Sequence, residues 1–129
     1  MDPVKVLQRA YQDELLDALR ADGAAQGVPY PHVRALLLEV ARRERAHAEA
    51  LAEALRRRGA PLPPTPKPEE GGWETLLRLL SEEGLDRAYY LESTFPDPEL
   101  EALFTRLGQE ERLNQEAVRK AVMLIGGGL

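Results

Sequence analysis

Residues 41–51 read ARRERAHAEAL, and alanine, arginine, glutamate and leucine, which make up most of this segment, are strong helix formers. Within it, Glu44 and His47 stand three positions apart, so both side chains lie on one face of the predicted helix. The apolar face, traced in steps of three and four from Val33 to Leu55, passes through these two residues. Two polar side chains therefore interrupt the predicted buried face, which indicates a polar site inside the protein.

The rest of the chain reads as three further helices. Prolines and glycines gather between the helical segments, and alternating β-branched runs, which favour strands, are absent from the sequence. Asp2 and Asp97, each followed by proline, are favourable N-caps for the first and fourth helices. The four predicted helices cover residues 3–25, 31–58, 73–94 and 98–125. We therefore expect an all-α fold.

The connections predict how these helices are arranged. Short links join the first helix to the second and the third to the fourth, so residues 3–58 and 73–125 should form two antiparallel hairpins. Residues 60–71 are rich in proline and predict a stiff, extended crossover. Two hairpins joined by one long crossover is the connectivity of a ferritin-like four-helix bundle, and 129 residues suit a single domain.

The two hairpins also match each other in sequence. Residues 35–55 align without gaps on residues 102–122, and residues 13–17 match residues 82–86 more weakly. The match suggests that an ancestral helix pair was duplicated, which agrees with the predicted pair of hairpins.

Glutamates interrupt the apolar faces of the other helices as well. Carboxylates buried together cost several kcal/mol, roughly, unless they change their pKa or bind a cation. Di-metal carboxylate bundles use one Glu from each of two helices and a Glu-x-x-His from each of the other two. On that pattern the predicted metal ligands are Glu14, Glu44, His47, Glu83, Glu111 and Asn114, with Asn114 in the place of a second histidine.

Other residues on the predicted inward faces are assigned to packing. They include Ala18 in the first helix and Leu36 in the second. Tyr90 in the third is expected to pack with its hydroxyl hydrogen-bonded; the alternative is that it hydrogen-bonds the metal site or serves in redox chemistry. Arg87 shares that face and either marks its edge or pairs with a carboxylate.

Three places in the chain carry a resemblance to a known family: residues 41–51, Glu83 with Tyr90 seven positions later, and residues 97–104 followed by Glu111. They are similar to motifs of the rubrerythrin branch of the ferritin-like superfamily. The resemblance covers most of the chain and is strongest in the second and fourth helices. It implies a centre of two iron ions that reacts with oxygen or peroxide, often as a peroxidase. The ligand set also suits manganese or zinc.

Two departures from the family pattern change what the resemblance implies. The chain contains no cysteine, so it lacks the cysteine-rich rubredoxin domain of full rubrerythrins, and electrons would come from another protein. Asn114 is a weaker iron ligand than histidine, which leaves one metal position weak or vacant. The resemblance also implies a homodimer.

Composition excludes several other classes of protein. The formal net charge is −5, which disfavours nucleic acid as a partner. No apolar run approaches the ~20 residues that span a bilayer, and the N-terminus lacks the pattern of a signal peptide, so we expect a cytoplasmic protein. The sequence contains no glycine-rich phosphate loop and no nucleophile elbow.

Two alternatives to redox chemistry remain open. One is metal storage or sensing, with a single ion at Glu44 and His47. The other is a ferritin-like scaffold that has lost its metal site.

Overall fold

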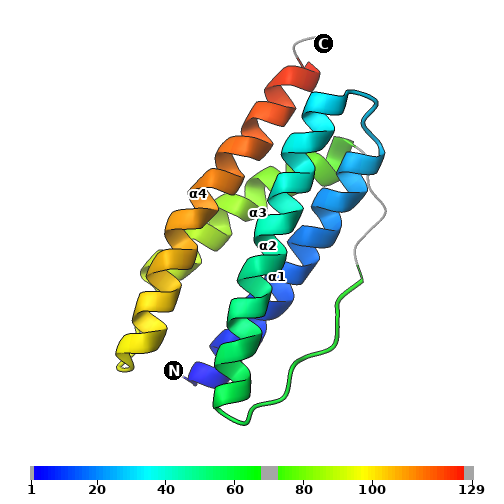
Figure 1. Ribbon diagram of the computed structural model, residues 1–129. Helices are drawn as coiled ribbons and strands as arrows, with labels where there is room; N and C mark the ends of the chain where they lie inside the picture. Colours follow the sequence, from blue (N-terminus) through cyan, green and yellow to red (C-terminus); the bar gives the residue numbers. More distant parts are fainter. Residues whose placement is uncertain (1, 68–72, 127–129) are drawn as a thin grey trace.

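The computed structural model describes residues 2–67 and 73–126, and in the second range the side chains of residues 73–77 and 80–84 are outside the description. The described residues form helices and connecting segments without a β-strand, so the all-α prediction is confirmed. The helices are α1 (Pro3–Gln26), α2 (Pro31–Arg57), α3 (Trp73–Glu92) and α4 (Pro98–Gly126) (Figure 1).

The helix ends follow from local capping chemistry. The backbone N–H of Val4 donates to Oδ1 of Asp2 at 3.0 Å, so Asp2 caps α1 as predicted. Asp97 caps α4 in the same way, through the N–H of Glu99 at 2.9 Å. After α2, Gly59 adopts a φ of 64°, a left-handed conformation that glycine takes without steric cost. Helix α3 ends at Glu92, two residues before its predicted end.

Contacts between residues from different helices show how the helices pack together. Helix α1 packs mainly against α2 and also against α3, while α4 packs against α3 and α2. His47 contacts Glu111 and Glu44 contacts Asn114, so α2 and α4 run antiparallel. Contacts of Glu14 with His47 and with Tyr90 link α1 to α2 and to α3. The chain is therefore a four-helix bundle made of two hairpins, α1–α2 and α3–α4 (Figure 1).

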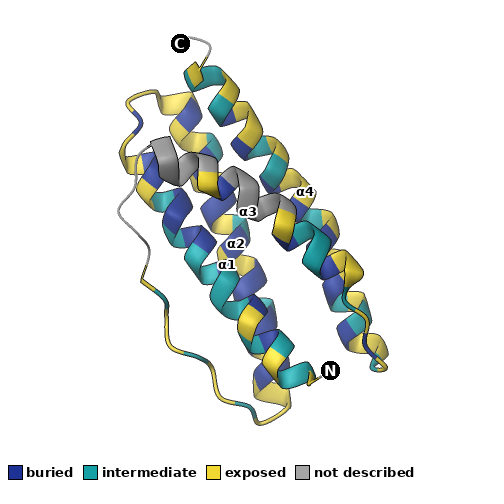
Figure 2. Cartoon of the chain, turned by 180° about the vertical axis from the view of Figure 1, so that it is seen from behind, coloured by how far each residue is buried: buried dark blue, intermediate teal, exposed yellow. Residues whose placement is uncertain are grey.

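The proline-rich segment after α2 runs alongside α1. The side-chain amides of Gln8 and Gln12 donate to the backbone carbonyls of Pro61 and Pro64, at 3.0 and 3.3 Å. Figure 2 shows this segment as an extended trace on the outside of the bundle. The part of the predicted crossover that the structure describes is thus extended, and its last residues, 68–71, lie outside the described residues.

Two separate apolar clusters form the core, one toward each end of the bundle. One gathers around Leu37, Leu79 and Val118, and the other around Leu7 and Phe104. Buried residues appear as dark blue segments on α1, α2, α4 and the described part of α3 (Figure 2). Between the two clusters, polar side chains are buried.

Among the described residues, no helix is long and apolar enough to cross a membrane.

The inward faces differ from the predicted ones in two helices. In α2, Leu37 is fully buried while Leu36 is only half-buried, so the predicted face is one residue off at that point. In α3, Asp86 is buried and Arg87 is half-buried. A helix face that packs against two neighbours is wider than a single line of residues, which explains why Leu37 and Asp86 are buried beside the traced line.

Candidate metal centre

A layer of buried polar side chains separates the two apolar clusters, and all four helices contribute to it. Its members, each at most 8 % exposed, are Glu14, Asp17, Arg20, Glu44, His47, Asp86, Glu111 and Asn114. We call this set the central polar layer. Buried charged groups are rare in proteins unless they are paired or bind metals, so the layer is the strongest candidate for a functional site.

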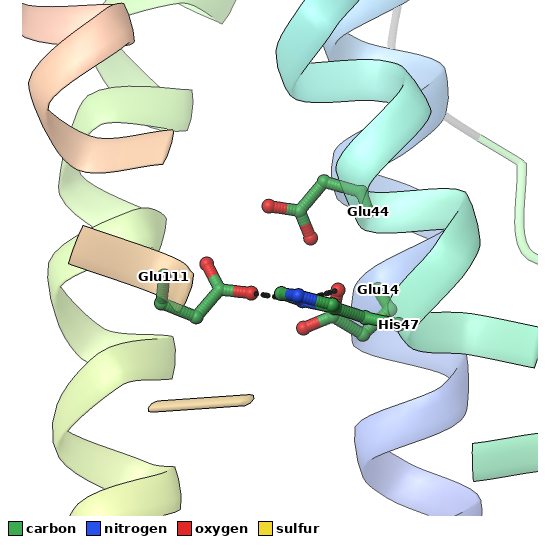
Figure 3. Close-up of side chains that lie close together, drawn as sticks. All are labelled: Glu14, Glu44, His47 and Glu111. Carbon is green, nitrogen blue, oxygen red and sulfur yellow. Dashed lines mark hydrogen bonds and ion pairs between the residues drawn. The ribbon is translucent and has the colours of Figure 1, made fainter. Parts of the chain in front are cut away.

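Four members of this layer point toward one another from three helices (Figure 3). Glu14, Glu44, His47 and Glu111 each offer a donor atom, and these four atoms lie within 4.8 Å of one another. Nδ1 of His47 is 3.2 Å from Glu14 Oε2 and 3.0 Å from Glu111 Oε1. We call these residues the four-donor group. All four were predicted as ligands, and the structure brings them together.

His47 is held on its other side by a fifth residue. Its Nε2 lies 3.0 Å from Oε1 of Glu110, a half-buried residue of α4. A proton on Nε2 would be donated to Glu110, and the lone pair of Nδ1 would then face Glu14 and Glu111. Histidines that bind metals commonly have their second nitrogen bonded to a carboxylate in this way. The arrangement therefore orients Nδ1 as a donor toward the four-donor group.

The carboxylates of the group are strongly perturbed. Burial raises the pKa of Glu14 well above the ordinary value, and repulsion from Glu111 raises it further. Burial also raises the pKa of Glu44, with added repulsion from Glu14 and Glu111. Without a cation, burial and mutual repulsion therefore favour the protonated forms of these two side chains. A metal ion would replace those protons and stabilise the ionised carboxylates.

Tyr90 supports Glu14 from α3. The Tyr90 hydroxyl donates to Glu14 Oε1 at 2.8 Å, and its ring packs edge-on against Phe104 with the centroids 5.0 Å apart. Burial, followed by the negative charges of Glu14 and Glu111, raises the pKa of Tyr90 well above that of free tyrosine. The hydroxyl therefore stays protonated and keeps donating. Tyr90 therefore packs with its hydroxyl hydrogen-bonded, as expected, and its role beside a bound metal stays a prediction.

Replacing Tyr90 with Phe should destabilise the metal-free protein by about 1–2 kcal/mol, because a buried oxygen of Glu14 loses its donor. Metal affinity should fall by about tenfold, the usual effect of removing a group that orients a ligand. Urea unfolding and a metal titration measure the two effects. Tyr89→Phe is the matched control, since its half-buried ring also packs near Phe104. Equal effects of the two changes would contradict a specific role for Tyr90.

Asn114 lies in the layer but makes two other contacts. Its Oδ1 accepts from Nη1 of Arg43 at 2.6 Å, and its Nδ2 donates to Oε1 of Glu44 at 2.5 Å. Arg43 is held in turn by Glu39 at 3.0 Å. An asparagine binds metals through its oxygen, and here that oxygen faces a guanidinium. The prediction that Asn114 is a ligand stays a prediction, and it requires Arg43 to move.

Glu83, the last predicted ligand, belongs to α3, but the structure does not describe its side chain. Its role as a ligand also stays a prediction.

Two buried acids were missed by reasoning from the sequence. Asp17 and Asp86 lie close to Glu44, with one oxygen of each within 4.8 Å of the others. Arg20, also buried, contacts Asp17 at 3.4 Å. The signal was present in the internal match, where residues 13–17 align on 82–86 and Asp17 falls on Asp86.

Comparisons of this chain with known protein families, with curated proteins and with solved structures gave no match.

Proposed function

We propose that this protein is a ferritin-like, non-haem metal protein that holds iron in its central polar layer and reacts with hydrogen peroxide or oxygen. The observation that carries the proposal is the four-donor group: one imidazole and three carboxylates, fully buried, with donor atoms within 4.8 Å of one another. Such a donor set suits iron, manganese or zinc.

The arrangement of the helices supports the ferritin-like part of the proposal. Two hairpins pack so that α2 faces α4 and α1 faces α3, and an extended segment leaves α2 along α1. In ferritin-like bundles the metal ligands project inward from facing helices. Here α1, α2 and α4 project the four-donor group into the space between two apolar clusters.

The hydrogen bonds of these residues are compatible with a bound metal ion. Oε2 of Glu44 is buried and has no hydrogen-bond partner among the described residues. Such an oxygen costs about 1–3 kcal/mol if nothing binds it. The imidazole of His47 is already oriented by Glu110, with Nδ1 facing the carboxylates. Both features leave buried donor atoms that a metal ion could bind.

Redox chemistry at this site needs groups from outside the chain as well as inside it. Bound iron would supply one-electron steps near the substrate. Reduction of one hydrogen peroxide to two water molecules takes two electrons and two protons. The chain has no cysteine and therefore no thiolate-bound cluster, so we assign the electrons to an external donor protein. Tyr90 orients Glu14, and Glu110 orients His47.

One observation favours a second candidate function, in which the site holds a single ion for storage or sensing. Arg43 places its guanidinium on the oxygen of Asn114, which stands where the family has a second histidine. A guanidinium there supplies the positive charge that a metal ion would otherwise bring. In this reading one ion binds at the four-donor group and no turnover of peroxide follows.

The metal content of the purified protein, measured by elemental mass spectrometry before and after loading with ferrous iron under reducing conditions, tests the proposal. A Glu44→Ala/His47→Ala variant should lose all metal. The matched control is Glu49→Ala/His32→Ala, which changes an exposed glutamate and an exposed histidine of the same helix.

Two irons per chain, lost in the first variant and kept in the control, would support the di-iron reading and make peroxide consumption the next assay. One metal per chain without peroxide consumption would favour storage or sensing. No metal after loading would overturn the proposal and leave a helical scaffold.

A further inference from the structure

A second cluster of donor atoms lies in the central polar layer. Asp17, Glu44 and Asp86 each offer one oxygen, and these oxygens lie within 4.8 Å of one another. They come from α1, α2 and α3 and are 2 %, 0 % and 8 % exposed. We call them the three-carboxylate group. It shares Glu44 with the four-donor group, and Asp17 follows Glu14 by three positions, so the two groups are neighbours along the bundle.

Two oxygens of this group lack hydrogen-bond partners. Oε2 of Glu44 and Oδ2 of Asp86 are buried and accept no hydrogen bond from any described residue. Buried polar atoms in proteins are nearly always bonded, so each exception needs an explanation. The other oxygen of Glu44 already accepts from Asn114. Glu44 and Asp86 therefore each present a buried oxygen that no described residue bonds, as expected of carboxylates that bind a cation.

The charges around the group also leave room for a cation. Arg20 lies beside Asp17 at 3.4 Å, but Arg43 faces Asn114 and Glu39 instead. A divalent cation would bind the three buried carboxylates at once and balance their negative charge.

We propose that Asp17, Glu44 and Asp86 bind a second cation, a hard divalent ion such as Mn²⁺, with Glu44 shared between the two positions. The inference rests on the proposed metal centre, because Glu44 belongs to both groups. Oxygen-only donor sets favour manganese, magnesium or calcium, while an imidazole suits iron or zinc. The two positions therefore differ in the metal they prefer.

This assignment places the second ion on residues other than those expected from the family pattern. That pattern would put it at Glu83, Glu111 and Asn114. In the structure the oxygen of Asn114 is occupied by Arg43, whereas Asp86 has an oxygen with no hydrogen-bond partner among the described residues.

The test is a titration of the whole chain with Mn²⁺, in which EPR spectroscopy counts the ions that are bound. Three variants separate the positions: Asp86→Asn for the three-carboxylate group, His47→Gln for the four-donor group, and Glu83→Gln for the family pattern. Glu92→Gln is the matched control for Asp86→Asn, because it also changes an acid to its amide in α3 but at an exposed position. Circular dichroism checks that each variant folds.

We expect two Mn²⁺ per chain in the unchanged protein, in Glu83→Gln and in Glu92→Gln. Asp86→Asn and His47→Gln should each keep one, with the lost ion at least tenfold weaker. In the unchanged protein the two ions should give the EPR signal of a coupled pair, because they share Glu44.

Three results would overturn the inference. The first is a second ion that survives in Asp86→Asn but is lost in Glu83→Gln. The second is a single ion that only His47→Gln removes, which would leave the proposed function standing. The third is no bound Mn²⁺ at all, which would count against both. An ion that only Asp86→Asn removes would support binding at the three-carboxylate group but would overturn the shared pair and the centre at His47.

Discussion

Raising the pH from about 5 to about 8 should lower the melting temperature of the metal-free protein by roughly 10 °C or more. The folded state keeps protons on Glu14, Glu44 and Asp86, whose pKa values burial raises above the ordinary range. The unfolded chain releases the same protons near pH 4. Their contribution to stability is therefore complete below about pH 4 and is lost as the pH rises toward the folded-state pKa.

The size of the effect follows from proton counting. Each proton that the folded state holds in excess costs about 1.4 kcal/mol of stability per pH unit. One excess proton over three pH units gives about 4 kcal/mol, and each kcal/mol is worth a few degrees in a chain of this length. For Asp86 the loss continues up to about pH 11.

Bound metal should reverse the trend, because the ion replaces the protons and competes better with them as the pH rises. The difference in melting temperature between metal-loaded and metal-free protein should widen with pH. Calorimetry with a chelator or with Mn²⁺ measures it. A Glu44→Gln/Asp86→Asn variant removes two titrating groups and should show a flatter pH dependence. A metal-free protein that gains stability from pH 5 to pH 8 would contradict a protonated layer.

Local signals in the sequence were enough to predict the helices. Asp2 and Asp97 cap α1 and α4 through bonds to residues two positions on, so their role depends only on neighbouring residues. The same holds for Gly59 after α2, where a positive φ is needed. Spacing along one helix also placed Glu44 and His47 on the buried side.

Features that depend on contacts between helices were harder to predict. Asp17 and Asp86 were missed because the traced faces passed through their neighbours, Ala18 and Arg87. A helix in contact with two others buries a face wider than one line of residues. Arg43 was missed because its long side chain reaches Asn114 on another helix from a partly exposed position. Such contacts depend on the axial position of one helix relative to another, and the periodicity within one helix does not determine that position.

Replacing Glu44 with Leu and Asn114 with Val together should stabilise the metal-free protein by about 1–4 kcal/mol, the range found when buried polar pairs are replaced by apolar residues. The pair is removed as a unit, because Asn114 donates to Glu44 and either partner alone would be left unbonded. Arg43 keeps its contact with Glu39 and remains partly exposed, so it loses only one bond. The variant should bind no metal at the four-donor group.

This prediction separates function from fold as the reason for the central polar layer. Glu44 and Asn114 lie between two apolar clusters, where leucine and valine would extend the core and remove only one hydrogen bond from outside the pair, the one that Arg43 donates to Asn114. Urea unfolding with a chelator measures the change, and Glu49→Leu/Glu116→Val, at exposed positions of the same helices, should stay within about 0.5 kcal/mol of the unchanged protein. A less stable double variant would mean that the polar pair supports the fold, as in a scaffold. A more stable variant without metal would mean that the chain retains these residues at a cost in stability, as expected for a metal site.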